Sequence, residues 1–296
     1  MIRKVVIQFL RATARGPLVD ALPPTGASPA PASTVAGGAA AKTKESPLGK
    51  LFRIVGRFVG RFLTPKMKAW IQEVLINTFR ITVDFQPAQA LETSQAAALD
   101  WLQAKDGAER VGDYFEFGVY QGGSVACMHR TLAVRPELSQ VRIFGFDSFE
   151  GLPDTAEQDG VWLPGQYRSA LSFTRSRLDE AGVDWRRTHL VKGFFSDSLT
   201  PELVREHGLE RAGLIMIDCD LYTSTREALE FCAPLIREHA VIFFDDWLST
   251  DEGHGEQRAF REFLDAHPYF DTEAADGWHD EAKIFYLSRR SDSATD

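Results

Sequence analysis

Residues 114–124 read YFEFGVYQGGS, a short apolar run that leads directly into a glycine-rich turn. Such a run is typical of a β-strand buried on both faces, because a strand of this kind has no solvent-facing side to keep polar. Similar runs follow along the chain, and helical patterns separate them. The runs are residues 114–119, 141–146, 189–191, 214–217 and 241–244. This alternation predicts a doubly wound α/β domain with a mostly parallel sheet.

Helix signals support the alternation. Thr200 followed by Pro201 predicts an N-cap and a first helical residue. Ser224 with Glu227 fits a capping box at the start of another helix. The apolar stripes expected on this helix and on a later one are Ala228, Cys232, Leu235 and Ile236, then Phe260, Phe263 and Leu264.

Charge divides the chain into two unlike parts. The first 80 residues carry 13 Lys and Arg against three acids, whereas the remainder carries 20 against 39. An acidic globular part would repel phosphates over most of its surface, so we expect no nucleic-acid partner. Within the basic part, residues 1–47 predict a flexible extension and linker, because residues 16–47 are rich in Ala, Pro and Gly.

Residues 48–80 form the second basic segment, which we predict to be an amphipathic helical segment. Phe52, Val55, Val59 and Phe62 recur at helical spacing, and Arg53, Arg57 and Arg61 form a second stripe. Two interpretations stay open: packing on the main domain, or peripheral contact of residues 50–63 with a membrane or a partner. The main domain is predicted to cover residues 81–290, with a disordered tail at 291–296.

The cysteines indicate a reducing compartment. Cys127, Cys219 and Cys232 show no CxxC spacing and read as small buried thiols. No stretch has the composition of a membrane-spanning helix or a clear secretory signal. We therefore expect a cytoplasmic protein, membrane-peripheral if the basic helix binds a lipid surface.

Ligands of doubly wound sheets bind beyond the carboxyl ends of the strands, so the residues that end each run are candidate site residues. Gly118, Gly122 and Gly123 allow the backbone to approach a ligand closely. They match neither the dinucleotide fingerprint nor a P-loop. Asp147, at the end of the second run, offers an acceptor-only group to the hydroxyls of a ribose. A ligand-free turn and a turn-capping aspartate remain the plainer alternatives.

Three aspartates end the fourth and fifth runs: Asp218, Asp245 and Asp246. Adjacent parallel strands deliver their carboxyl ends side by side, so these carboxylates should lie together and repel one another. A hard divalent cation such as Mg²⁺ neutralises such a group. The alternative is three solvated aspartates that only cap loops.

These motifs together resemble the macrocin O-methyltransferase family, whose members are metal-dependent enzymes that methylate sugar hydroxyls of macrolides and related natural products. The resemblance spans residues 110–250 and rests on five segments in the family's order. The segments are GDYFEFGVYQGGS, FDSFEGLP, GFFSDSL, IDCDLYTST and FFDDW. It implies a Rossmann-like class I methyltransferase domain with a seven-stranded sheet, a transferase that uses S-adenosylmethionine, and Mg²⁺ or another divalent cation.

The resemblance also implies roles for single residues. Glu116, Gly118 and Gly122 would line the methionine end of the cofactor, Asp147 would hold its ribose and Asp197 would lie near its adenine. Asp218 would be both a metal ligand and the general base. The complete expected set is Glu116, Gly118, Gly122, Ser124, Asp147, Ser148, Asp197 and Asp220 for the cofactor, and Asp218, Asp245 and Asp246 for the metal.

Some positions depart from the family or stay ambiguous. Tyr120 and Gln121 replace the usual Trp-Arg pair, and Leu221 stands where catechol-type relatives carry a lysine, so a lysine base is not expected. Trp162 and Tyr167 fit either an aromatic lid or surface packing. His254 fits a solvated loop position better than a catalytic one.

The expected acceptor is a hydroxyl of a sugar, a glycan or another small natural product. Two rival functions stay open, a cofactor-binding scaffold without activity and a metal-dependent hydrolase that uses the same aspartates. The hydrolase leaves the glycine turn and Asp147 unexplained. Relatives of this kind often pair, so a homo-oligomer also stays open.

Overall fold

The computed structural model describes residues 65–155, 162–249 and 253–290. The chain divides into two compact units, residues 1–85 and 86–296. The described part of the first unit contains one helix, α4 (Pro65–Phe79). The predicted extension 1–47, the helix pattern around residues 50–63 and the tail 291–296 lie outside the described residues. In the part that is described, no helix is both long and apolar enough to cross a membrane.

The second unit is built on a seven-stranded sheet with the order β3-β2-β1-β4-β5-β7-β6. The strands are β1 (Asp113–Phe117), β2 (Ile143–Asp147), β3 (Thr188–Lys192), β4 (Ala212–Ile217), β5 (His239–Phe244), β6 (Phe270–Asp276) and β7 (Lys283–Arg289). The first five are parallel, and β7 pairs antiparallel with both β5 and β6. The predicted doubly wound, mostly parallel fold is therefore confirmed.

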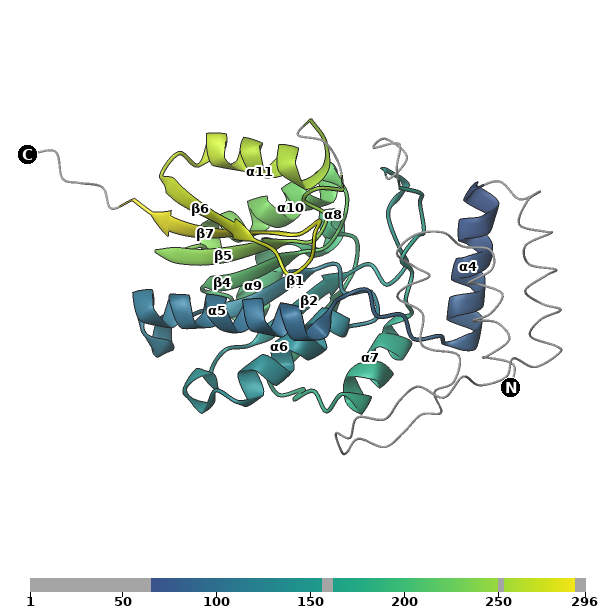
Figure 1. The fold of residues 1–296 in the computed structure, drawn as a ribbon, viewed down its shortest axis with the longest axis horizontal. Coiled ribbons are helices and arrows are strands. Elements are labelled where there is room, and N and C mark those ends of the chain that lie inside the picture. The colour runs from purple at the N-terminus through teal and green to yellow at the C-terminus, as the bar shows by residue number, and fades with distance from the viewer. Residues whose placement is uncertain (1–64, 156–161, 250–252, 291–296) are drawn as a thin grey trace, which may run out of the picture. The chain divides into compact units, whose positions relative to one another are not determined.

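Helices cover both faces of the sheet (Figure 1). One face carries α5 (Ala88–Asp106), α6 (Gly123–Ala133) and α7 (Leu171–Glu180). The other carries α8 (Phe195–Ser198), α9 (Pro201–His207), α10 (Tyr222–Cys232) and α11 (Gly255–Ala266). Short 3₁₀ turns at Ala108–Arg110, Pro136–Leu138 and Ala233–Leu235 complete the layers.

The helix predictions succeed in part. Thr200 caps α9 as expected, because its side chain accepts a hydrogen bond from the Leu203 N–H at 3.2 Å, and Pro201 opens the helix. The capping box at Ser224 is wrong, because α10 already begins at Tyr222 and Ser224 is buried within its first turn. Of the predicted stripe, Leu235 and Ile236 lie beyond the end of α10, although both are buried in the same core.

Phenylalanine side chains fill the core between the central strands and the layer of α10 and α11. The register pairs Phe115 with Phe144 and Phe117 with Phe146, so four rings share one face of β1 and β2. Their centroids lie 4.8 to 6.4 Å apart across these contacts. Side chains alternate along a strand, so the neighbours Tyr114 and Glu116 must face the opposite layer, toward α5 and α6.

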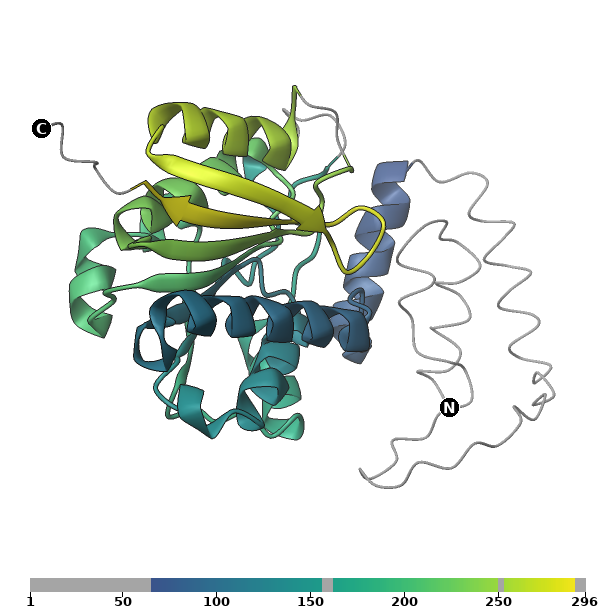
Figure 2. The ribbon, with the colours of Figure 1, turned by 60° about the vertical axis from the view of Figure 1, so that its left-hand side comes forward.

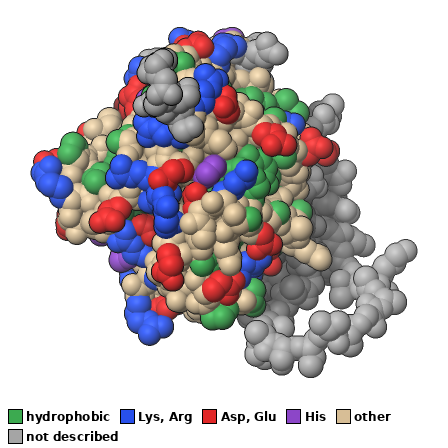
Figure 3. All heavy atoms as spheres, turned by 90° about the vertical axis from the view of Figure 1, so that its left-hand side faces the viewer, with side chains coloured by type: hydrophobic (Ala, Val, Ile, Leu, Met, Phe, Trp, Pro, Cys, Tyr) green, Lys and Arg blue, Asp and Glu red, His purple; other side chains and the backbone are tan. Residues whose placement is uncertain are grey.

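The two ends of the sheet differ in character. Figure 3 shows basic and acidic side chains interspersed on the face at the amino ends of the parallel strands. Several are paired there, including Arg110 and Arg211 with Glu238, and His239 with Asp106. At the opposite end, the β6–β7 hairpin extends its loop in the same direction as the carboxyl ends of the parallel strands (Figure 2).

The aromatic core gives a stability prediction. We expect Phe146→Ala to lower the free energy of unfolding by about 3 to 5 kcal/mol, because a fully buried ring leaves a cavity within a rigid layer. Val134→Ala is the control, since Val134 is 75% exposed, and it should change stability by less than about 0.5 kcal/mol. Urea unfolding of both variants measures the difference, and equal effects would contradict this account of the core.

Candidate active site

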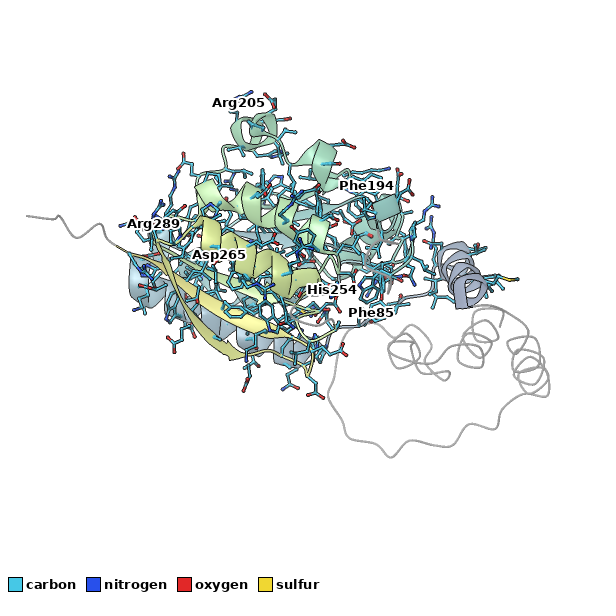
Figure 4. All side chains as sticks on the ribbon, turned by 90° about the horizontal axis from the view of Figure 1, so that it is seen from above. Phe85, Phe194, Arg205, His254, Asp265 and Arg289 are labelled. Carbon is cyan, nitrogen blue, oxygen red and sulfur yellow. The ribbon has the colours of Figure 1, made fainter. Side chains whose placement is uncertain are left out.

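The carboxyl ends of β1, β4 and β5 bring the predicted site residues together. The hydrogen-bond ladder continues beyond the strands: the Asp218 N–H donates to the Phe117 carbonyl at 2.9 Å, and the Asp245 N–H donates to the Ile217 carbonyl at 3.0 Å. The backbone positions of Asp218 and Asp245 are therefore set by neighbouring strands. Figure 4 labels Phe194 and His254, which lie toward this end of the domain, and Arg289, which lies at the opposite end.

Asp218, Asp245 and Asp246, here called the aspartate trio, meet at this edge. Each offers a carboxylate oxygen, and the three oxygens lie within 4.8 Å of one another. Burial and the neighbouring carboxylates raise the pKa of Asp218 well above its usual value and that of Asp246 to about 6. The geometric expectation from the sequence is thus met, whereas the role of these residues as metal ligands stays a prediction.

The trio fits a divalent cation by its chemistry. All three offer hard carboxylate oxygens, which Mg²⁺ prefers as ligands. Burial first, and then the neighbouring carboxylates, raise the pKa values of Asp218 and Asp246 above their ordinary value. A bound cation would favour the ionised form of each carboxylate.

Three residues that were not predicted from the sequence form a hydrogen-bond network around the trio. The Gln86 amide donates to Asp245 Oδ1 at 2.8 Å and to Asp218 Oδ2 at 3.3 Å. His279 Nε2 lies 2.8 Å from the same Asp245 oxygen, and the Trp278 indole donates to Gln86 Oε1 at 2.6 Å. Trp278 and His279 belong to the β6–β7 loop, whose strands were not recognised in the sequence.

A second layer of carboxylates lies behind Asp246. The Asp246 N–H donates to Glu256 Oε2 at 3.1 Å, and the Ser249 hydroxyl donates to Asp246 Oδ1 at 2.8 Å. Glu256 is 1% exposed and burial raises its pKa well above the ordinary value. Asp220, predicted near the cofactor, is also buried, has a raised pKa through burial and the Asp246 charge, and adopts a positive φ of 62°. Asp220 was predicted from the sequence as a site residue, whereas Glu256 was not.

The glycine-rich turn packs directly against β4. A Cβ at Gly118 would stand 1.7 Å from the Asp218 carbonyl oxygen, and the φ of Gly118 is +94°. Any side chain here would displace the strand end that carries Asp218. Gly122 caps α6 in the left-handed conformation, with φ +83° and the Leu178 side chain 2.9 Å from a hypothetical Cβ. Both glycines are therefore required by geometry, whatever binds at the turn.

Asp147 turns its carboxylate toward this glycine-rich turn. Oδ2 accepts hydrogen bonds from the Val119 and Tyr120 N–H groups, both at 2.8 Å, and Oδ1 accepts one from the Phe149 N–H at 2.5 Å. Two oxygens accept about four hydrogen bonds, so roughly one acceptor position remains for a ribose hydroxyl. Asp147 thus holds the turn through backbone hydrogen bonds. Its contact with the ribose remains a prediction from the sequence.

Glu116 is a buried carboxyl beneath the turn. It is 0% exposed, and it accepts hydrogen bonds from the Tyr114 hydroxyl at 2.6 Å and the Ser124 hydroxyl at 2.7 Å. Burial raises its pKa to about 8, although both hydroxyl groups oppose the rise. Glu116 therefore holds a proton at neutral pH unless a cationic group approaches it.

The remaining candidates are Ser148, Asp197 and the aromatic residues Trp162 and Tyr167. The Ser148 hydroxyl donates to the Gly151 carbonyl at 2.8 Å. Asp197 is exposed in α8, after β3, and its carboxylate accepts a 3.4 Å hydrogen bond from the Ser196 hydroxyl. Tyr167 packs edge to face with Tyr120 and contacts Trp162, with centroids 6.1 and 5.9 Å apart. The Tyr167 ring therefore lies between the ring of Tyr120, in the glycine-rich turn, and that of Trp162. Residues 156–161 lie outside the described residues.

The raised pKa of Glu116 predicts a pH dependence of stability. The folded state binds the proton more tightly than the unfolded state, so wild-type stability should fall as pH rises from about 4.5 to about 8 and then level off. Glu116→Gln removes this titration, so its stability relative to wild type should increase over that interval. Urea unfolding at several pH values measures the difference, and parallel profiles would show that Glu116 does not titrate there.

Comparison with known sequences identifies the family. The sequence profile of the macrocin O-methyltransferase (TylF) family matches residues 96–269, more than half of the chain. The chain belongs to this family. The membership predicted from the five motifs is thereby confirmed, and the match extends beyond them to the C-terminal part of α5 and to α11.

Two curated relatives, both named as O-methyltransferases, are similar to the chain. One is the 8-demethyl-8-(2,3-dimethoxy-alpha-L-rhamnosyl)-tetracenomycin-C 4'-O-methyltransferase of Streptomyces olivaceus, 28% identical over 144 residues. The other is the demethyldecarbamoylnovobiocin O-methyltransferase of Streptomyces niveus, 26% identical over 148 residues. Each alignment covers 46% of this chain and 53% of the relative, so the chain spans about half the length of the relatives that it matches.

A solved structure supports the same fold. The O-methyltransferase NovP matches with a TM-score of 0.52 and 19% identity, covering 67% of this chain and 80% of that chain. At this identity the likeness concerns the fold alone. Together with the strand order described above, it confirms the predicted class I methyltransferase fold.

Proposed function

We propose that the protein transfers a methyl group from S-adenosylmethionine to a sugar hydroxyl of a natural product, with a divalent cation, such as Mg²⁺, held by the aspartate trio. Three carboxylate oxygens within 4.8 Å beside a glycine-rich turn are the observation that carries this proposal. The family and the two curated relatives, both named as O-methyltransferases, support the reaction class.

The cofactor supplies an activated methyl group on a sulfonium centre, so this chain's residues mainly bind and orient. Gly118 and Gly122 stand where a Cβ would collide with neighbouring atoms, and Asp147 holds the turn through hydrogen bonds to its backbone. Glu116 lies beneath the turn, where a carboxylate could receive the ammonium group of the cofactor. An ammonium in that position would favour the ionised form of Glu116 and release its proton.

Asp218 is the residue that we assign as general base. It would accept the proton of the acceptor hydroxyl as the oxygen attacks the methyl carbon and the bond from that carbon to sulfur breaks. Burial and the neighbouring carboxylates raise the pKa of Asp218, so a nearby positive charge would favour the ionised form that can act as a base. The divalent cation would supply that charge and polarise the acceptor hydroxyl.

The residues around the trio fit a polar acceptor with vicinal oxygens. Ser249 and His279 add hydrogen-bonding groups next to Asp246 and Asp245, and Leu248 is 60% exposed beside them. A sugar diol offers two adjacent oxygens to such a surface. Both curated relatives are named for natural-product substrates, and the rhamnosyl name of the first is consistent with a sugar hydroxyl.

Asp245→Asn tests the role of the trio. We expect Mn²⁺ binding to be lost and methyl transfer to fall at least roughly a hundredfold, because the cation and the base would no longer be held together. Cofactor affinity should stay within about threefold. Asp276→Asn is the matched control, because the Asp276 side chain is 103% exposed. Turnover that persists in Asp245→Asn and in EDTA would overturn the metal role.

An acceptor screen separates enzyme from scaffold. Full-length protein with methyl-labelled cofactor and Mg²⁺ would be offered sugar nucleotides, glycolipids and glycosylated polyketides. Label transfer to a sugar oxygen supports the proposed function. Cofactor binding by calorimetry without transfer to any member of the panel would favour the non-catalytic scaffold, and loss of cofactor binding would revive the hydrolase.

A further inference from the structure

The Gln86 side chain bridges two members of the aspartate trio. Gln86 precedes α5, and its amide nitrogen lies 2.8 Å from Asp245 Oδ1 and 3.3 Å from Asp218 Oδ2. The two acceptors extend from adjacent strands, β4 and β5. A single NH₂ group therefore satisfies carboxylates from both strands and reduces the repulsion between them.

Trp278 fixes which end of the amide faces the aspartates. An indole N–H can only donate, so the group that it contacts at 2.6 Å must be the Gln86 carbonyl oxygen. Trp278 is 6% exposed, and its ring packs on Phe243 with centroids 5.6 Å apart. The amide cannot exchange its oxygen and nitrogen without losing this hydrogen bond, so the two N–H donors stay directed at the trio.

A cation and this amide can compete for the same oxygens. A divalent ion that bound Asp218 Oδ2 and Asp245 Oδ1 would approach the two oxygens that accept the Gln86 N–H groups, and it would repel those positively polarised donors. In that arrangement the ion displaces the amide. The amide is uncharged and can be displaced by rotation of its side chain, whereas the backbones of Asp218 and Asp245 are held by hydrogen bonds to the neighbouring strands.

The geometry points to Gln86 as a positioning residue that holds Asp218 and Asp245 together before the cation arrives and that withdraws when the cation binds. This role rests on the proposed function, because it requires that the trio binds a cation. Gln86 then competes with the ion, so removing its amide should strengthen cation binding while weakening the cation-free protein.

Mn²⁺ titration of the full-length protein tests this role, with free Mn²⁺ followed by electron paramagnetic resonance. In Gln86→Met we expect the dissociation constant to fall by roughly threefold to tenfold, because the ion no longer displaces hydrogen bonds to charged groups. The same variant should melt at a lower temperature than wild type without Mn²⁺, and the difference should shrink when Mn²⁺ is present. Gln89→Met, an exposed position in the first turn of α5, should match wild type in both measurements.

Trp278→Phe is the second variant, because it keeps an aromatic ring in the core while removing the indole donor. The Gln86 amide can then turn its carbonyl oxygen toward the ion, so Mn²⁺ binding should again tighten. If wild type binds Mn²⁺ but Gln86→Met binds it equally or more weakly, the competing role of Gln86 is overturned while the metal site stands. If wild type and all variants fail to bind Mn²⁺, the metal-binding part of the proposed function is wrong, and the role proposed for Gln86 is wrong as well.

Discussion

Repulsion between carboxylates at the tips of β4 and β5 is the constraint on which the site depends. The ladder hydrogen bonds from Asp218 to Phe117 and from Asp245 to Ile217 fix the two backbones side by side, so the side chains cannot separate freely. Like charges held this way raise one another's pKa values unless a positive group intervenes. Hydrogen-bonding side chains surround these carboxylates. Gln86 and His279 form hydrogen bonds with Asp245, and Ser249 donates one to Asp246.

The same edge of the sheet shows how a packed core supports a polar site. The phenylalanine layer between the strands and α10 and α11 makes the central strands rigid on one face. On the other face, Glu116 and Tyr114 place a buried polar pair below the glycine-rich turn. Gly118 lets that turn approach the carbonyl of Asp218 directly. The glycine-rich turn and the aspartate trio therefore belong to the same edge of the sheet.

The Asp147 carboxylate has a structural role in the turn, which the sequence offered as the plainer alternative to contact with a ribose. From the sequence, its place after a buried strand suggests contact with a ribose. In the structure it accepts three backbone hydrogen bonds, two from the residues that follow Gly118. These bonds hold the turn in shape, so substitution of Asp147 would disturb the turn as well as any ligand contact.

Sequence alone determined the fold class, five of the seven strands and the family, because buried parallel strands appear as continuous apolar runs and their last residues are polar. It also placed Asp218, Asp245 and Asp246 at adjacent strand ends. It did not reveal β6 and β7: most of β6 is exposed and β7 is only partly buried, so neither gives a continuous apolar run. With that hairpin it missed Trp278 and His279.

Only the tertiary structure decided which side chains complete the site. Gln86 and Trp278 lie 192 positions apart in sequence, yet the amide and the indole meet beside the trio. Glu256 approaches Asp246 from the first turn of α11. The residue type alone does not indicate a position beside the aspartate trio, because glutamine, tryptophan and glutamate occur throughout the chain. Their function depends on chain segments that packing brings together, and local sequence patterns carry no record of those long-range contacts.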